Sequence, residues 1–218
     1  MANLSESLFR DKFNKQMDTK LIVGLGNPGR EYTFTRHNIG FRILENWLNN
    51  LSITIPDCPC QLSDNKKHQA KTTKIKIKDQ NVILAEPTTY MNNSGLAVKS
   101  LADYYNLQTE DILIIHDDLS FPLGKFKLDF QAGPAGHNGV KSIINHLQTQ
   151  NFYRLRIGIA KPMGSCPVNH QGGHDFVLGK FTSEEEELIA DLLSTTVDLL
   201  NYYLAHGPSA TQNKFNGR

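Results

Sequence analysis

Two polar stretches, each following a short apolar run, carry side chains that could perform acid–base chemistry. The first runs from Asn27 to His37, and the second contains Asp117 directly after the apolar residues 112–115. A carboxylate that accepts a hydrogen bond from one imidazole nitrogen fixes the tautomer and leaves the other nitrogen able to take a proton from water. His37 and Asp117 could therefore form a general base. The alternative is structural, because a histidine in a loop or an aspartate after a strand often only stabilises a turn.

Neutral amides are the candidates for binding the carbonyl on which such a base would act. Asn92 and Asn138 lie in further polar stretches, and Asn27 begins the first one. Asparagine can donate to a carbonyl oxygen and accept from a peptide N–H, which suits a substrate with amide bonds. The chain has no G-x-S-x-G motif, and Cys58 and Cys60 lie in a proline-flanked loop without an adjacent base. Direct attack by water is therefore favoured over a covalent intermediate.

A glycine-rich loop at residues 24–29 matches G-x-G-x-x-G, the pattern of a dinucleotide site. That site needs a helix opening at the glycines, yet Pro28 removes one N–H and the next convincing helix begins well after the loop. The acid expected about 20 residues further on is also missing, since Asn49 stands there. We therefore favour a loop that presents Asn27 and His37 to a cleft, with a simple turn as the alternative.

Positive charge is distributed unevenly along a chain whose formal net charge is only +1. Alternate residues of a strand face the same side, so Lys125 with Lys127, and Arg154 with Arg156, could each direct two cations at phosphates. Alternatively, the charges lie on a solvated edge strand and prevent it from pairing with another chain. We favour this alternative for the lysines within residues 66–78. Charge alone leaves the choice open for Lys127 and Arg156.

The apolar pattern predicts the elements that must position these side chains. Strands are expected near residues 20–23, 74–78, 82–85, 112–115, 125–128 and 154–159. Helices are expected at residues 38–51, 94–105 and 139–147, and from a capping box of Ser183 and Glu186 to just before Gly207. This alternation predicts an α/β fold: a single domain with a mixed, twisted β-sheet covered by helices on both faces.

Composition restricts the class of protein further. The chain has 218 residues, of which 39% are hydrophobic and 21% charged, as in a soluble globular domain. It lacks both an apolar run near 18 residues and an N-terminal export segment, so we expect a cytoplasmic protein without a membrane span. Three cysteines are too few for a disulfide framework. The spacing of His170 and His174 resembles a zinc motif, but Gln171 replaces its general base, so we expect no metal.

Several motifs occur in the order in which they are found in bacterial peptidyl-tRNA hydrolases, and the sequence resembles that family. The motifs, which together with Tyr32 carry the resemblance, are GLGNPG at 24–29, RHN at 36–38, PTTYMN at 87–92, HDDL at 116–119, GHNG at 136–139 and DFVLGKF at 175–181. They cover about residues 20–205 of the chain. This agreement is too extensive to arise by chance.

The resemblance implies roles for individual residues. It implies that His37 is the catalytic base and that Asp117 orients it. It further implies that Asn27 and Asn92 position the water and the peptide carbonyl. Asn138 would clamp the peptide backbone, and Tyr32 and Met91 would line the site. It also implies a clamp for tRNA phosphate made of Lys127 and Arg156, with Lys125 as a nearby contact.

The resemblance implies an activity as well. The protein would be a hydrolase that cleaves the ester between the peptide carbonyl and the 3′ ribose of peptidyl-tRNA, which recycles the tRNA. Members of the family are monomeric single-domain proteins without a cofactor, so we expect peptidyl-tRNA as the partner and a monomer. We expect an N-terminal extension at residues 1–19, the catalytic domain at 20–206 and a C-terminal tail at 207–218.

The chain departs from the family pattern at residues 129–135, where a more glycine-rich and more basic loop is usual; affinity for tRNA could be lower as a result. Two alternative functions remain. One is an inactive RNA-binding protein on the same fold, against which the presence of both His37 and Asp117 argues. The other is a nucleotide-dependent oxidoreductase that uses the glycine loop, which would bind NAD(P).

Overall fold

A mixed sheet of seven strands forms the centre of the computed structural model, which describes residues 19–59, 61–160 and 173–217. The strands follow the order β2-β3-β4-β1-β5-β7-β6. Their bounds are β1 Thr19–Gly24, β2 Ser63–Asn65, β3 Ala70–Ile77, β4 Gln80–Pro87, β5 Ile112–Pro122, β6 Phe126–Phe130 and β7 Tyr153–Ala160. The predicted α/β class with a mixed sheet is confirmed, whereas the expected extension lies, up to residue 18, outside the described residues.

The four strands in the middle of the sheet, β4, β1, β5 and β7, run parallel to one another. The apolar stretch Leu21 to Val23 in β1 is fully buried, as is 112–115 in β5. Strands covered on both faces must be apolar on both sides, which is why these stretches are continuous and do not alternate. Because the strands are parallel, their carboxyl ends meet along one edge of the sheet, where polar loops can converge.

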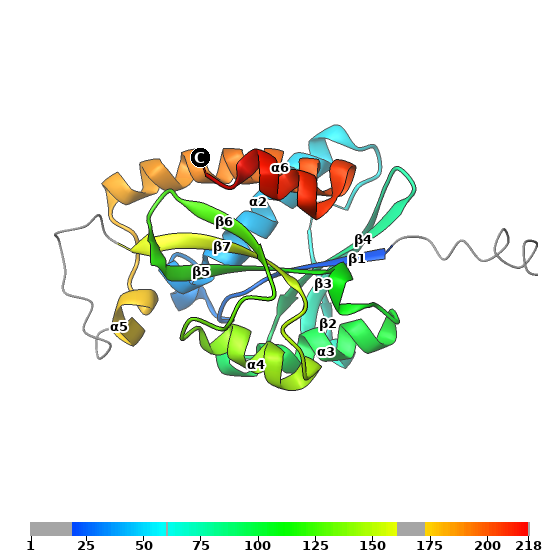
Figure 1. Cartoon of the computed structure of the whole chain (residues 1–218), viewed down its shortest axis with the longest axis horizontal. Coiled ribbons are helices and arrows are strands. Elements are labelled where there is room, and N and C mark those ends of the chain that lie inside the picture. The colour runs from blue at the N-terminus through cyan, green and yellow to red at the C-terminus, as the bar shows by residue number, and fades with distance from the viewer. Residues whose placement is uncertain (1–18, 60, 161–172, 218) are drawn as a thin grey trace, which may run out of the picture.

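Helices cover both faces of this sheet, as predicted (Figure 1). Their bounds are α2 Ile39–Thr54, α3 Ser94–Tyr104, α4 Asn138–Leu147, α5 Gly173–Leu178 and α6 Ser183–Phe215. Helices α2 and α6 pack on one face around Trp47, whose Nε1 donates to Oδ1 of Asn201 at 2.9 Å. Helices α3 and α4 pack on the other face. No helix among the described residues is both long and apolar enough to cross a membrane.

Two local predictions were wrong by small amounts. The capping box of α6 is formed by Thr182 and Glu185, one residue before the predicted pair. The same helix also continues beyond the predicted end: Gly207, with a φ of 80°, introduces a kink, and the helix then runs on to Phe215. Just beyond that end, the side-chain amide of Asn216 hydrogen-bonds both backbone groups of Leu128 in β6. The last turns are therefore attached to the sheet.

A pair of glycines brings the start of α2 against the sheet. A Cβ atom on Gly24 would lie 2.5 Å from the backbone oxygen of Gly40, and one on Gly40 would lie 2.4 Å from the oxygen of Ile115. No side chain fits at either position without moving the backbone. The residues that precede α2, including the short 3-10 turn Arg36–Asn38, are thereby held over the carboxyl ends of β1 and β5.

Candidate active site

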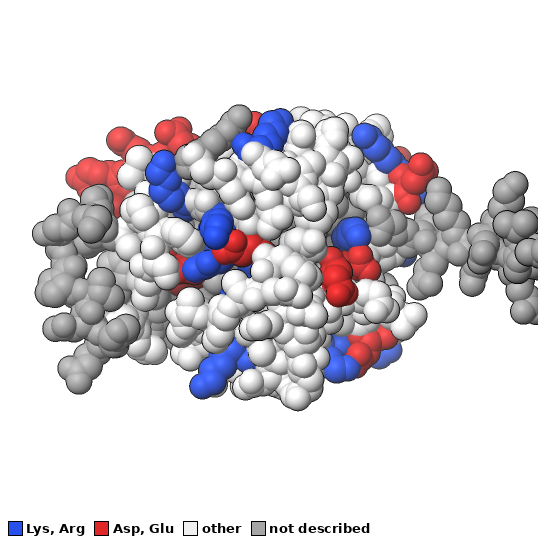
Figure 2. Space-filling model, viewed as in Figure 1, with Lys and Arg blue, Asp and Glu red and all other residues white. Residues whose placement is uncertain are grey.

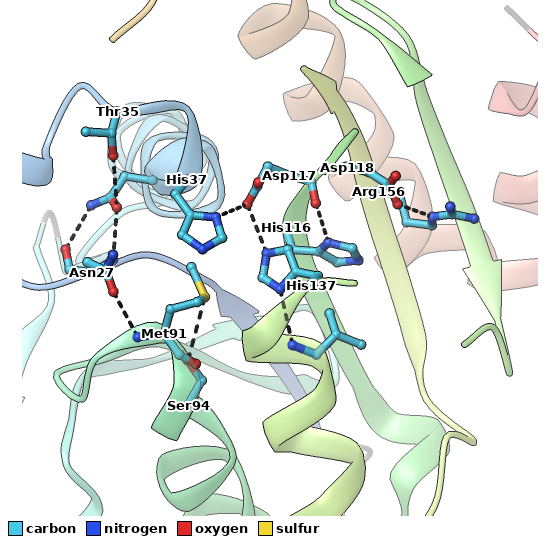
Figure 3. A network of polar contacts seen from close by, with 12 residues as sticks. Asn27, Thr35, His37, Met91, Ser94, His116, Asp117, Asp118, His137 and Arg156 are labelled. Atoms are coloured by element: carbon cyan, nitrogen blue, oxygen red, sulfur yellow. Dashed lines mark hydrogen bonds and ion pairs between the residues drawn. The ribbon is translucent and has the colours of Figure 1, made fainter. Parts of the chain in front are cut away.

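His37 and Asp117 meet directly, although they lie 80 residues apart in the chain (Figure 3). Nδ1 of His37 lies 2.8 Å from Oδ1 of Asp117. Both residues are buried, with exposures of 8% and 2%. Nε2 of the histidine has no hydrogen-bond partner within the described part of the chain. If Nδ1 carries the hydrogen, as the contact with a carboxylate requires, Nε2 is left as a proton acceptor.

Asp117 lies within a strand and not after one, contrary to the sequence-based expectation. Strand β5 continues through residues 116–118 to Pro122 because β7 pairs beside it, with Asp117 opposite Ile157. The long-range pairing with β7 overrides the local signal that three polar residues end a strand. The backbone that carries the carboxylate is consequently paired with β7, just beyond the point where the pairing of β5 with β1 ends at Ile115.

His137 is a second partner of Asp117 that the sequence analysis did not identify. Its Nε2 lies 2.9 Å from the same Oδ1 atom, and its Nδ1 accepts the N–H of Val140 at 3.2 Å as the N-cap of α4. With Nδ1 accepting that N–H, the contact with Asp117 is made through Nε2. The available signal was the position of His137 directly before a predicted helix, where a side chain usually accepts backbone N–H groups.

Burial and neighbouring charges shift the pKa values of Asp117 and His37 in opposite directions. Burial alone would raise the pKa of Asp117, but His37 and His137, which both contact its carboxylate, hold it well below its usual range. Burial alone would lower the pKa of His37, yet the nearby carboxylate raises it above its ordinary value. Burial, and then His137, lower the pKa of the neighbouring His116 to about 3, so that imidazole stays neutral. The arrangement suits proton abstraction by His37.

A cavity of about 250 Å³ opens beside this pair. Its walls include His37, Asp117 and Leu119, together with Asn138 at the start of α4. Among the substrate-binding residues predicted from the resemblance, only Asn138, which is exposed, lines this cavity. The cavity is wide enough for a water molecule and part of a substrate beside Nε2 of the histidine.

Asn27 is held in a network next to the cavity (Figure 3). Its Oδ1 accepts the N–H of Met91 at 2.8 Å, its own N–H donates to Oδ1 of Asn38 at 2.9 Å, and its carbonyl accepts from Nδ2 of Asn38 at 2.9 Å. Asn38 was not predicted as a site residue. The bond from Met91 to Oδ1 fixes the orientation of the Asn27 amide, and its NH₂ group is left as a hydrogen-bond donor.

The other predicted substrate residues do not line the cavity beside His37. Met91 is buried, and its backbone is the partner of Asn27. Tyr32 is half-buried and meets the ring of Tyr90 edge-on at 6.4 Å between centroids. Asn92 is exposed and does not line the cavity beside His37. A substrate that extends beyond this cavity could contact these side chains.

Lys127 and Arg156 lie side by side on β6 and β7, as a phosphate clamp requires. Both have acidic partners, which were not predicted. Nζ of Lys127 lies 2.9 Å from Asp129, whereas the Arg156 guanidinium contacts both Asp129 and Asp118 at 2.7 Å. Lys125 is exposed and forms no ion pair with a described residue. Figure 2 accordingly shows blue side chains mixed with red ones over this region, and no continuous basic surface.

Three potential metal ligands come together in the site, namely His37, Asp117 and His137, with their ligand atoms within 4.8 Å of one another. Both histidines direct their N–H groups at the same carboxylate oxygen, so these groups hydrogen-bond one another in the arrangement described here. For the disfavoured zinc motif, His170 lies outside the described residues, and His174 is exposed beside Asp175.

Comparison with known proteins agrees with this geometry. The family model of peptidyl-tRNA hydrolase matches residues 21–218. A crystal structure of a peptidyl-tRNA hydrolase in complex with N-propanol has 35% sequence identity and a TM-score of 0.80, covering 91% of this chain and 95% of that one. The enzyme from Acinetobacter baumannii has 34% identity and a TM-score of 0.80, covering 92% and 96%. The chain therefore belongs to the peptidyl-tRNA hydrolase family, as its sequence motifs predicted.

Proposed function

We propose that this protein hydrolyses the ester between the peptide carbonyl and the 3′ ribose of peptidyl-tRNA, releasing the peptide and recycling the tRNA. Membership of the family supports the reaction. The observation that carries the mechanism is the buried contact of 2.8 Å between His37 and Asp117 beside an open cavity. We further propose that the enzyme acts as a cytoplasmic monomer and needs no metal or cofactor.

The base acts through Nε2 of His37. This nitrogen takes a proton from water, and the resulting hydroxide attacks the ester carbonyl to give a tetrahedral intermediate. Asp117 accepts the hydrogen bond from Nδ1 and stabilises the imidazolium that forms. When the intermediate collapses, the C–O bond to the ribose breaks and the proton on Nε2 passes to the departing ribose oxygen. No covalent enzyme intermediate is required.

Asparagines supply the remaining contacts in this mechanism. The NH₂ group of Asn27, whose orientation is fixed by the bond from Met91, donates to the carbonyl oxygen as negative charge develops on it. Asn138 at the cavity wall and Asn92 outside the cavity contact the peptide backbone, and Tyr32 and Met91 border it. A substrate with a free α-amino group matches these amides poorly, and each buried polar group left unmatched costs about 1–3 kcal/mol.

Lys127 and Arg156 bind phosphate groups of the tRNA in this proposal, with Lys125 as a further contact. Arginine and lysine on neighbouring strands present several donors to one phosphate. The ion pairs with Asp118 and Asp129 orient these side chains while also competing with the phosphate for them. The affinity for tRNA should therefore fall as the salt concentration rises. The slope of log affinity against log salt concentration should reflect the number of phosphates contacted.

The test compares release of the amino acid from N-acetylated aminoacyl-tRNA and from the unblocked form of the same tRNA. We expect rapid release only from the blocked substrate. His37→Ala should lower turnover by about 10²- to 10⁴-fold while leaving tRNA affinity almost unchanged. No release by the native protein would favour the alternative of an inactive RNA-binding protein. Equal loss of turnover and affinity in the variant would show that His37 is a binding residue.

A further inference from the structure

A second cavity, of about 360 Å³, shares no lining residue with the hydrolytic one. The hydrogen-bonded pair Asn27 and Asn38 forms part of its wall, while His37 and Asp117 do not line it. It is bordered by the loop after β1, by α2 and by the ends of β3 and β4. Its volume falls in the range of about 300–1,000 Å³ that is typical of small-molecule sites. Of the residues given a role in the proposed hydrolysis, only Asn27 borders this cavity.

Glu86 is a wall residue of this second cavity and lacks the partners that a buried carboxyl normally has. It is 3% exposed, and its Oε1 is shielded from solvent without a hydrogen-bond partner among the described residues. Burial, and then the charge of Glu45, raise the pKa of Glu86 to about 8, with Lys71 acting in the opposite direction. Near neutral pH the group is therefore mainly a neutral carboxyl that can donate a hydrogen bond.

Two cations at this cavity, Arg30 and Lys71, form no direct ion pair with a described residue, although Lys71 acts on Glu45 and Glu86 from a distance. Lys71 stands directly opposite Glu86 in the β3–β4 register. Arg42, which also borders the cavity, is paired with Glu186 at 2.7 Å. With Glu86 neutral, Arg30 and Lys71 outweigh the remaining acid, Glu45. The cavity therefore attracts an anion.

Sheet order indicates which part of the substrate reaches this cavity. Along the edge of the sheet, the phosphate clamp lies on β6 and β7, Asp117 on β5, Asn27 after β1, and Glu86 near the end of β4. An ester has its alcohol on one side of the carbonyl and its acyl group on the other. With the tRNA held at β6 and β7 and the carbonyl at β5, the peptide must extend towards β1 and β4.

We propose that this cavity is a peptide subsite that selects an acidic side chain, aspartate or glutamate, close to the ester. Arg30 and Lys71 neutralise its carboxylate, and the Glu86 carboxyl donates a hydrogen bond to it. The inference rests on the proposed function, because the substrate's direction follows from the position of the clamp. It adds to that function a preference among peptides that depends on residues outside the hydrolytic cavity.

The experiment compares acidic and amide side chains of equal shape. N-acetyl-Glu and N-acetyl-Gln are attached to one tRNA, directly or through an intervening glycine, and kcat/KM is measured for each. At pH 7 we expect the glutamate substrate to be favoured about fivefold in one of the two pairs, the effect of a partly screened charge interaction. A ratio of one in both pairs would overturn the subsite. Absence of turnover with every substrate would instead contradict the proposed function.

Variants connect the preference to the cavity. Glu86→Gln keeps a hydrogen-bond donor and should keep the preference at both pH 7 and pH 9, whereas the native enzyme should lose it at pH 9 as Glu86 ionises. Glu86→Leu and Lys71→Gln should each bring the ratio close to one, with thermal melting used to confirm that both are folded. Lys141→Gln, which changes an exposed lysine on α4, should leave the ratio unchanged. A preference that survives both Glu86→Leu and Lys71→Gln would refute the assignment.

Discussion

The imidazoles of His37 and His137 lie 4.9 Å apart between ring centroids and donate to one and the same oxygen, Oδ1 of Asp117. The negative charge that raises the pKa of His37 is therefore shared with a second donor. The N–H of Val140 occupies Nδ1 of His137, so this ring does not itself replace the base. Its position suggests that it adjusts how strongly Asp117 acts on His37.

His137→Leu should shift the acidic limb of the kcat/KM profile to higher pH. Without the second donor, the carboxylate acts on His37 alone and raises its pKa further. Since only neutral His37 accepts a proton from water, a tenfold fall in activity at a fixed pH below that pKa corresponds to a rise of about one in the pKa. The measurement is the pH dependence of peptide release between pH 5 and 8.

Asp117→Asn provides the contrasting control for that change. A neutral amide no longer offsets burial, so the pKa of His37 should fall and the limb should move to lower pH. Turnover above the limb should drop by about 10²- to 10⁴-fold because the base is no longer oriented and its charged form is no longer stabilised. Movement of the limb in the same direction in both variants would contradict the roles assigned to His137 and Asp117.

Asp129→Asn should strengthen binding of tRNA. Asp129 contacts both cations of the proposed clamp, so its charge competes with phosphate for them. Removing it should tighten the Kd by about threefold to tenfold, the scale of a partly exposed ion pair. Binding titrations over a range of salt concentrations provide the measurement.

Asp118→Asn should have the opposite effect, although it touches the same Arg156. The Asp118 side chain is only 2% exposed and holds Nε of the arginine at 2.7 Å, so it orients the guanidinium. Its loss should weaken tRNA binding.

Lys127→Ala should weaken tRNA binding too, and it should lower the slope of log affinity against log salt concentration by about one. An unchanged slope would remove Lys127 from the clamp.

Glu86→Gln should stabilise the folded protein at alkaline pH. The pKa of Glu86 is raised from its ordinary value of 4.5 to about 8, so the folded state retains a proton that the unfolded chain has already lost. Stability is thus lost as pH rises from about 4.5 towards 8. The variant should be more stable than the native protein at pH 8.5 by about 5 kcal/mol, since a pKa difference of one corresponds to about 1.4 kcal/mol and the two pKa values differ by about 3.5. Urea unfolding at pH 8.5 measures this, and the difference should disappear at pH 4.

The sequence predicted those features that depend on local patterns. The apolar stretches around Leu21 and at 112–115 identified central strands, and apolar spacing identified α2 and α6. The meeting of His37 with Asp117 could also be expected, because both follow apolar runs whose strands are parallel. The capping box was displaced by one residue, since Thr182 and Ser183 each have a glutamate three residues later and only backbone geometry distinguishes them.

Features that arise from long-range contacts could not be predicted. The extension of β5 through Asp117 depends on β7, which follows much later in the chain. The pairing of Asp129 with Lys127 and Arg156 depends on the register of β6 against β7. Linear spacing contains neither the register nor the side-chain directions, so these partners appear only in three dimensions.

The acid and the base of the site are attached to parts of the fold that differ in rigidity. Asp117 belongs to β5, a strand bordered by β1 and β7, whereas His37 lies in a short 3-10 turn before α2. Strands in the centre of a sheet open only with global unfolding, while short turns can open locally. In deuterium exchange, the amide of Asp117 should therefore be protected far longer than that of His37. On warming, the enzyme should become inactive through loss of its base while the sheet that carries the acid is still intact.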